Sequence, residues 1–278
     1  GESVAIRGEV SSQFLSALML VAGTALSQPL TIRVEGSLVS EPYIQMTERM
    51  LREWGLTFET TQNAGETSYT FTPTSAAWFG KLTEYAIEPD ASAASYFWAA
   101  AAILGNRIMV TGLPENSLQG DVRFADALAG FGARIRFEDH AIIAEAPASG
   151  RLQAIDADMN HIPDAAMTLA VVALFAEGTT RLTNIGSWRV KETDRIAAMA
   201  TELRKLGAKV EEGADWIAVT PPPALTANAA IDTYDDHRIA MCFSLASLGA
   251  RGVPVRINDP KCVNKTFPTY FDVFATLA

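Results

Sequence analysis

Long apolar runs and cysteines are scarce in this sequence of 278 residues. The apolar runs at 99–104 and 170–176 are much shorter than the roughly 20 residues that a membrane-spanning helix needs, so no membrane span is expected. Cys242 and Cys262 are the two cysteines, and they lack the close spacing of paired metal ligands. Neither a disulfide framework nor a structural zinc site is therefore predicted, and a reducing, cytoplasmic compartment is the expected location.

Basic charge is also in deficit, because the formal net charge is -10 at pH 7. This argues against a general nucleic-acid binder, which needs a basic face to displace counterions. The lysines and arginines that are present gather in short segments, at 189–195, at Arg238 and at 261–265. A local cationic site in an acidic protein indicates a small anionic ligand.

The composition is that of a globular protein, with 49% hydrophobic residues and enough length for one or two buried cores. The first residue is Gly1, and no signal-like or transit-like segment follows it. We therefore expect Gly1 to be an internal start within a longer protein.

One pattern recurs along the chain: an apolar helix, a short strand, a polar loop, a second helix, a glycine and a pair of strands. The glycines are Gly55, Gly132 and Gly207, and alternating β-branched or aromatic residues follow them. A left-handed residue at a helix end is least costly when it is glycine. The sequence thus predicts an α/β protein of about three and a half β-α-β-α-β-β units, the last of which stops after its second helix.

The first helices of the units are expected within 11–26, 92–105, 163–178 and 235–250. They begin with Ser, Asp or Pro, which satisfy or do without the free amides of a first turn. The hydrophobic pattern is interrupted between the first two units, so we expect a domain crossing near residues 79–90. Residues 1–80 are then the last unit of one domain, and residues 81–278 are most of another.

Polar side chains stand at the starts of the predicted helices, where free amides and the helix dipole attract anions. Ser11, Ser12 and Gln13 offer two hydroxyls and a carboxamide, and Asp164 follows Pro163. Taken singly, the serines and the aspartate are also explained as helix caps or first-turn residues. Only their recurrence in several units favours a site.

The run at 187–195 is denser in charge. A helix that begins near Val190 would place Lys191, Glu192 and Arg195 on one face, one turn apart. A solvated first turn with internal ion pairs is the alternative. Against that alternative, cations such as Arg189 and Lys191 are disfavoured at the positive end of a helix unless an anion is bound.

Residues 235–238, an Asp-Asp-His-Arg run, enter another apolar helix. Two aspartates and a histidine allow a metal site, but no further ligand cluster is visible in the sequence. Arg238 at a helix start again favours an anion, and Lys261 and Lys265 occupy the corresponding loop of the last unit. Because the units repeat, their corresponding ends are expected to meet at one face.

Four of these segments resemble EPSP synthases, the 3-phosphoshikimate 1-carboxyvinyltransferases, in order and spacing. The segments are DMNHIPDAAMTLAVVALF (158–175), RVKETDRIAAMATELRKLGA (189–208), DDHRIAMCFSLA (235–246) and DPKCVNKTFP (259–268). The runs SSQFLSALML, SEPYI and DASAASYF agree as well. The resemblance covers essentially the whole chain.

The resemblance implies the two-domain enolpyruvyl transferase fold, an inside-out α/β barrel of three repeated units per domain, which is incomplete in this chain. It implies transfer of the carboxyvinyl group of phosphoenolpyruvate to the 5-hydroxyl of shikimate 3-phosphate, with release of phosphate. The route is addition followed by elimination, with no metal or organic cofactor. These two substrates are the expected small-molecule partners, and neither nucleic acid nor membrane is expected as a partner.

The resemblance also assigns roles to residues of this chain. Asp164 would accept the hydroxyl proton, and Glu192 would deliver and later remove the proton of the methylene carbon. Phosphoenolpyruvate would be held by Gln13, Arg195, Arg238 and Lys265, and shikimate 3-phosphate by Ser11, Ser12, Ser40, Tyr43 and Lys191. His237 would order the Arg238 loop or assist proton movement, and Ser187 would contact substrate at a position where Asn is common in the family.

The family's N-terminal Lys-Ser-x-x-x-x-Arg segment, and a later glycine-rich loop with its arginine, have no counterpart here. We therefore expect a separate N-terminal fragment of the same enzyme as a partner. Three alternatives remain beside this reading: a non-catalytic anion-binding half of a two-chain enzyme, a UDP-N-acetylglucosamine carboxyvinyltransferase, and an RNA-processing cyclase. The runs SSQ, SEPY and RVKETDR disfavour the second, and the acidity and the lack of a nucleophilic histidine context disfavour the third.

Overall fold

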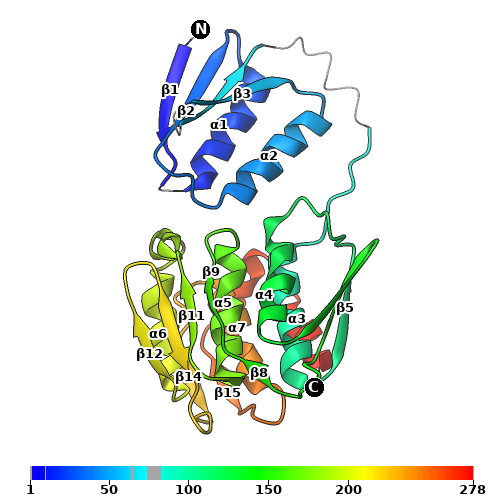
Figure 1. The fold of residues 1–278 in the computed structure, drawn as a ribbon, viewed down its shortest axis with the longest axis vertical. Coiled ribbons are helices and arrows are strands. Elements are labelled where there is room, and N and C mark those ends of the chain that lie inside the picture. Colours follow the sequence, from blue (N-terminus) through cyan, green and yellow to red (C-terminus); the bar gives the residue numbers. More distant parts are fainter. Residues whose placement is uncertain (1, 10, 64–65, 74–82, 278) are drawn as a thin grey trace. The chain divides into compact units, whose positions relative to one another are not determined.

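The computed structural model describes residues 2–9, 11–63, 66–73 and 83–277. The chain divides into two compact units (Figure 1): a smaller one of Gly1–Glu88 with Leu118–Gly120, and a larger one of Pro89–Ser117 with Asp121–Ala278. The predicted domain bounds, 1–80 and 81–278, stay a prediction. Residues 79–82 of the expected crossing lie outside the described residues.

The smaller unit contains one complete copy of the predicted repeat. Its elements are β1 (Glu2–Arg7), α1 (Ser12–Ala25), β2 (Leu30–Glu35), α2 (Glu41–Glu53), β3 (Phe58–Asn63) and β4 (Glu66–Phe71). The strands form one sheet in the order β1-β2-β4-β3, in which β1 and β2 are parallel and the other pairs antiparallel. Helices α1 and α2 lie side by side (Figure 1) and cover a core that includes Leu15, Ile32 and Ile44.

The larger unit holds the remaining elements. The helices are α3 (Ala91–Leu104), α4 (Phe124–Gly130), α5 (Pro163–Val172), α6 (Arg195–Lys205), α7 (His237–Ser244) and α8 (Tyr270–Phe274). The strands are β5 (Arg107–Thr111), β6 (Arg134–Glu138), β7 (Ala141–Glu145), β8 (Leu152–Gln153), β9 (Asp156–Asp158), β10 (Ala176–Glu177), β11 (Thr180–Thr183), β12 (Lys209–Glu212), β13 (Ile217–Thr220), β14 (Ala229–Ile231) and β15 (Val255–Ile257). Short 3-10 helices are η2 (Gly120–Arg123), whose first residue is counted with the smaller unit, η3 (Ala173–Phe175), η4 (Gly186–Val190), η5 (Leu245–Ser247), η6 (Pro260–Lys265) and η7 (Ala275–Leu277).

The strand pairing confirms the repeat. The sheet β12-β13-β11-β9 has the same order as β3-β4-β2-β1, with β9 and β11 parallel and the other pairs antiparallel. Strands β5, β7 and β6 form the corresponding antiparallel part of another unit, and β14 and β15 the parallel part of the last. Gly55, Gly132 and Gly207 follow helix ends with φ of +86°, +96° and +92°, as predicted for the ends of the second helices.

Helices α3, α5 and α7 form the centre of the larger unit. Helix α5 contacts both α3 and α7, and most residues of the three helices are buried. This suits α3 and α5, which are apolar on every side. Polar side chains inside this core are paired with one another. The Ser95 and Thr168 hydroxyls are 3.0 Å apart, and the Thr168 hydroxyl is 3.6 Å from the Cys242 sulfur.

The helix start predicted near Val190 is wrong. Val190 ends the 3-10 helix η4, and α6 begins only at Arg195, because the Asp194 side chain caps it by accepting from the Ala197 amide at 3.1 Å. Lys191 and Glu192 therefore lie in the bend between the two helices rather than on a helical face. Arg189 lies in η4, and its side chain pairs with Asp194 at 2.7 Å.

Candidate anion-binding site

The site is built from the starts of three helices of the larger unit. Asp164 is the second residue of α5, Arg195 is the first of α6, and Arg238 is the second of α7. Helix α5 contacts both α6 and α7, so the three helix starts can share one cluster of side chains. Free backbone amides and the positive ends of helix dipoles converge at such a place.

Arg195 is the centre of this cluster. Its side chain is 1% exposed, and its guanidinium donates to three carboxylates from different elements. The distances are 2.7 Å from Nε to Asp236 Oδ2, 2.9 Å from Nη1 to Asp164 Oδ1 and 2.7 Å from Nη2 to Glu192 Oε2. A planar guanidinium with five N–H donors can hold several oxygens at once, which an ammonium group does less well.

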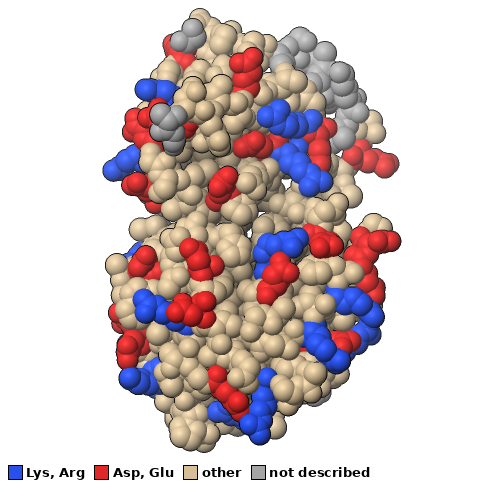
Figure 2. Space-filling model, viewed as in Figure 1, with Lys and Arg blue, Asp and Glu red and all other residues tan. Residues whose placement is uncertain are grey.

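Three further cations complete the cluster. Arg238 Nη2 lies 3.1 Å from Asp164 Oδ2, Lys191 Nζ lies 3.6 Å from Asp164 Oδ1, and Lys265 Nζ lies 2.5 Å from Glu192 Oε1. Four cations thus face three carboxylates, which leaves the cluster with one excess positive charge. Figure 2 shows both signs of charge interspersed over the visible face of the larger unit. An anion that reaches this cluster would meet an excess of donors although the chain as a whole is acidic.

The cations set the ionisation of the two predicted catalytic carboxyls. Burial disfavours the charged form of Asp164, but Arg238, Arg195 and Lys191 outweigh it and hold its pKa well below the usual range. Burial also favours the neutral form of Glu192. The hydrogen bond from Lys265 and the charge of Arg195 outweigh burial and lower the pKa of Glu192 to about 2. Both groups are carboxylates at neutral pH in this arrangement.

His237 is buried beside this cluster as a neutral side chain. Burial, followed by the charge of Arg238, lowers its pKa to about 4. Its side chain is 2% exposed, and neither ring nitrogen has a hydrogen-bond partner among the residues that the structure describes. Its Nδ1 lies 3.8 Å from Asp236 Oδ1, which is too far for a hydrogen bond.

Asp236 is a site residue that the sequence argument did not assign. It is fully buried, caps α7 by accepting from the Arg238 amide at 2.9 Å, and holds Arg195 with its other oxygen. The available signal was its place directly before an apolar helix, which is typical of an N-cap. That signal indicates a cap, but it does not predict the second bond to Arg195.

Two residues near the predicted Ser187 anchor the segment that carries Lys191 and Glu192. Trp188 is buried and donates from Nε1 to the Pro163 carbonyl at 2.6 Å, which ties η4 to the start of α5. Arg189 donates to the carbonyls of residues 213 and 214 in the β12–β13 turn. Arg189 is therefore held by protein oxygens and lies within η4 rather than at a helix start, so it gives no support to a bound anion. Ser187 itself is half-buried in η4.

The other predicted binding residues lie in the smaller unit, at the starts of α1 and α2. The Ser11 hydroxyl caps α1 by accepting from the Gln13 amide at 3.2 Å, whereas Ser12 is buried. Ser40 precedes α2 in the left-handed region with φ of +54°, and the Tyr43 amide donates to its carbonyl. A residue other than glycine with that φ is uncommon and is enriched at functional sites.

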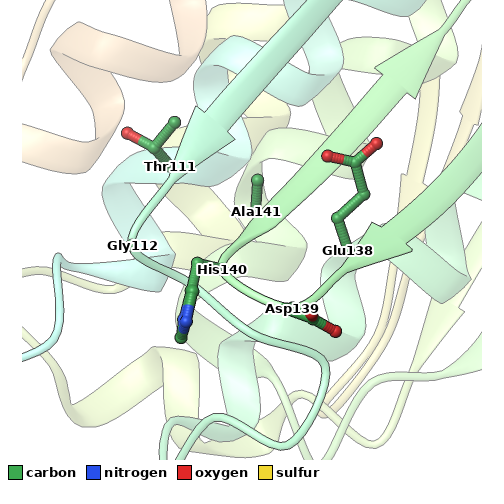
Figure 3. Close-up of a pocket in the computed structure, with 6 residues that line it drawn as sticks. All are labelled: Thr111, Gly112, Glu138, Asp139, His140 and Ala141. Carbon is green, nitrogen blue, oxygen red and sulfur yellow. The ribbon is translucent and has the colours of Figure 1, made fainter.

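The described residues contain no group of three or more His, Cys, Asp or Glu side chains arranged to hold a metal ion. A surface pocket at the ends of β5, β6 and β7 (Figure 3) is lined by Thr111, Gly112, Glu138, Asp139, His140 and Ala141. Glu138 and His140 point in different directions there, and none of the predicted site residues lines this pocket. Within the described chain, no helix combines the length and the apolar character that crossing a membrane requires.

Comparison with known proteins decides the family. The family model described as EPSP synthase (3-phosphoshikimate 1-carboxyvinyltransferase) matches residues 1–274. The chain belongs to the EPSP synthase family. Its similarity to curated members of that family is high: it is 59% identical over 278 residues to the 3-phosphoshikimate 1-carboxyvinyltransferase of Laribacter hongkongensis, and 58% identical over 275 residues to that of Thiobacillus denitrificans.

The alignment covers 100% of this chain for the Laribacter protein and 98% for the Thiobacillus protein, but 62% of each relative. The chain thus spans about 62% of the length of these EPSP synthases. Among solved structures, EPSP synthase from Acinetobacter baumannii superposes with a TM-score of 0.72 at 23% identity and covers 100% of this chain and 63% of that one. The enolpyruvyl transferase NikO from Streptomyces tendae gives 0.71 at 17%, with coverage of 100% and 64%. These likenesses confirm the predicted fold class.

Proposed function

We propose that the protein to which this chain belongs transfers the carboxyvinyl group of phosphoenolpyruvate to the 5-hydroxyl of shikimate 3-phosphate. The hydroxyl oxygen bonds to the carbon that carries the phosphate, while the methylene carbon takes a proton. Elimination then removes that proton and breaks the bond to phosphate, which leaves as the second product. The family and its named relatives support the reaction, and the cytoplasmic location stays a prediction.

The observation that carries this proposal is the cluster around Arg195. It joins Asp164 and Glu192, the two acid-base candidates, through one buried guanidinium, and it adds Lys191, Arg238 and Lys265 within 4 Å of those carboxylates. Addition and elimination need a base, an acid, and cations around phosphate and carboxylate groups. The cluster provides all three kinds of group.

In the proposed reaction Asp164 accepts the hydroxyl proton and contacts shikimate 3-phosphate. The depressed pKa of Asp164 keeps it ionised, which suits an acceptor but makes it a weak base until the charges around it change. An anionic substrate that takes up Arg238 and Lys191 would reduce their hold on Asp164 and raise its basicity. Substrate binding and base activation are then the same event.

Binding of phosphoenolpyruvate is expected to change the protonation of Glu192 in the same way. A carboxyl with a pKa of about 2 is ionised at neutral pH and cannot deliver a proton. Its two partners, Arg195 and Lys265, are residues that we assign to phosphoenolpyruvate. When the ligand's phosphate and carboxylate compete for these donors, the pKa of Glu192 rises toward its ordinary value, and proton delivery to the methylene carbon becomes feasible.

The direct test is Glu192→Gln, which keeps the shape of the side chain and removes the proton. We expect turnover of the complete enzyme, followed as phosphate release, to fall at least about 100-fold while phosphoenolpyruvate binding is largely kept. Glu212→Gln is the matched control, because Glu212 lies on β12 outside the cluster and pairs at 3.5 Å with the partly exposed Arg204 of α6. Near-normal turnover of the Glu192→Gln variant would remove Glu192 from the acid-base role.

We further propose that catalysis requires the part of the protein that corresponds to the rest of its relatives' length. Ser11, Ser12, Gln13, Ser40 and Tyr43 of the smaller unit would contribute contacts to substrate. The two units are then parts of the two domains of the family. To test this requirement, phosphate release is measured for the 278-residue chain alone. It is then measured while the separate N-terminal part of the enzyme is titrated in.

The competing function is an anion-binding half that does not turn over. A stoichiometric mixture that binds both substrates yet releases no phosphate would favour it. Full turnover by the isolated chain would contradict the requirement for a second part. Activity that appears only on mixing, and rises more steeply than linearly with concentration at low concentration, is the expected result.

A further inference from the structure

Glu202 is a charged residue at a position that is apolar in the other repeats. Glycines 55, 132 and 207 follow α2, α4 and α6, and the residues five positions before them are Met50, Ala127 and Glu202. The next residue is a buried leucine in all three helices, so the register is the same. Glu202 is fully buried, and a buried carboxylate is costly unless it is completely hydrogen-bonded.

The partners of Glu202 come from the loop that leads into α7. The Asp232 amide donates to Glu202 Oε2 at 3.0 Å, and the Tyr234 hydroxyl donates to Oε1 at 2.7 Å. Lys205, one turn further along α6, lies 2.8 Å from Oε2. Both carboxylate oxygens are thus engaged, and two of the three donors belong to the loop.

That loop has an unfavourable backbone conformation just where it reaches the anion-binding cluster. Tyr234 and Asp235 are consecutive residues with positive φ, +55° and +57°, although neither is glycine. The next residue is Asp236, which caps α7 and pairs with Arg195. Residues other than glycine keep a backbone conformation with positive φ only where surrounding contacts stabilise it, and Glu202 supplies such contacts.

Helix α6 therefore binds the loop through two residues on the same face of the helix. Arg195 binds Asp236, and two helical turns later Glu202 binds Asp232 and Tyr234. The Asp232 side chain is held as well, by Lys205 at 2.8 Å and by Asn258 at 2.7 Å. A loop fixed in this way can present Arg195 and Arg238 in one orientation.

We propose that Glu202 and Tyr234 are positioning residues that fix the β14–α7 loop and, through Asp236, the orientation of Arg195 and Arg238. They act on anion binding without touching the anion. This inference rests on the proposed function for the identity of the anion, phosphoenolpyruvate, but the fixing of the loop does not depend on it.

The test uses Tyr234→Phe, which removes only the hydroxyl, and Glu202→Gln, which removes the charge. Hydrogen exchange of the backbone amides reports the loop directly, and calorimetric titration of the chain with phosphoenolpyruvate reports the site. For Tyr234→Phe we expect amides of residues 232–238 to exchange about 5-fold faster or more, with the β12–β13 hairpin unchanged. Phosphoenolpyruvate affinity should fall about 3- to 10-fold, the range of one hydrogen bond, and further in Glu202→Gln.

Tyr270→Phe is the matched control. The Tyr270 hydroxyl is also hydrogen-bonded, 2.8 Å from the Ser244 hydroxyl and 3.1 Å from the Met241 carbonyl, but it contacts no residue of the loop in these bonds. Tyr270 is buried whereas Tyr234 is partly exposed, so the control loses its bond in the more buried setting. We expect Tyr270→Phe to lower the melting temperature at least as much as Tyr234→Phe, with loop exchange unchanged and affinity within about 2-fold.

Unchanged loop exchange in both variants would overturn the proposal. The proposal would also be overturned if phosphoenolpyruvate affinity fell in proportion to the melting temperature in both Tyr234→Phe and Tyr270→Phe. That result would indicate a general loss of stability. If the parent chain binds no phosphoenolpyruvate, either alone or mixed with the N-terminal part of the enzyme, while the loop exchange responds as expected, the positioning pair is supported and the proposed function of the site fails.

Discussion

The smaller unit and the β9–β13 repeat of the larger unit share one topology and differ in chemistry. Both have the strand order first-second-fourth-third, with a parallel first pair and antiparallel pairs after it. In the smaller unit the helix starts carry serines, Ser11 and Ser40. In the larger unit they carry Asp164 and the buried Arg195.

This difference shows that the fold and the site are specified separately. Apolar periodicity and the glycines at helix ends produce the same β-α-β-α-β-β unit in both places. The first turn of each helix is left to vary, because its amides are satisfied by any short polar side chain. A unit whose helix starts carry serines and a unit whose helix starts carry Asp164 and Arg195 can therefore arise from one repeat.

The largest expected difference is in unfolding free energy, between loss of a buried charged side chain in the larger unit and loss of an exposed one in the smaller unit. Arg195→Gln removes the cation shared by Asp164, Glu192 and Asp236, and we expect a loss of about 3 to 5 kcal/mol of unfolding free energy. Arg49→Gln in α2 of the smaller unit, where Arg49 pairs with Glu53 at the surface, should cost less than about 0.5 kcal/mol. Urea unfolding of the two variants measures both, and similar losses would contradict the comparison.

The second difference concerns pH. The pKa of His237 is lowered to about 4 in the folded chain, below its ordinary value of 6.5, so the folded state binds fewer protons than the unfolded state between these values. Stability from neutral His237 is therefore present above pH 6.5 and declines as pH falls toward 4, by about 2.5 kcal/mol at pH 4.5. His237→Gln should flatten the pH dependence of the unfolding free energy between about pH 6.5 and 4.5, which urea unfolding at a series of pH values measures.

The smallest difference is between the helix caps of the two regions. Asp194→Ala removes the cap of α6 and the partner of Arg189, and should cost about 1 to 2 kcal/mol. Ser11→Ala removes only a hydroxyl that accepts from the Gln13 amide at 3.2 Å, and about 0.5 to 1 kcal/mol is expected. Thermal unfolding compares the two, and an equal or larger loss for Ser11→Ala would show that the charged bend at 191–194 adds nothing.

Local signals predicted the repeat well. Helix-ending glycines need a backbone conformation that other residues adopt at a cost, so Gly55, Gly132 and Gly207 can be located from their sequence context alone. The second helix of the β9–β13 repeat is identified by the same signal, but its predicted start lies near Val190 instead of Arg195. Asp194 sets the start at Arg195, because its side chain accepts from the Ala197 amide, and the spacing of charges in the sequence does not show that bond.

By itself, the sequence determined the α/β class, the repeated unit, the helix ends and the residue types of an anion-binding site. Each of these depends on neighbours within a few positions of the chain, where periodicity, capping and turn geometry act. Only the tertiary structure decided which charges meet. Arg195 binds Asp236 across 41 positions and Lys265 reaches Glu192 across 73, and the buried Asp236 and Glu202 gain their roles from those meetings. Pairing over such distances follows from how helices pack, and local periodicity contains no information about it.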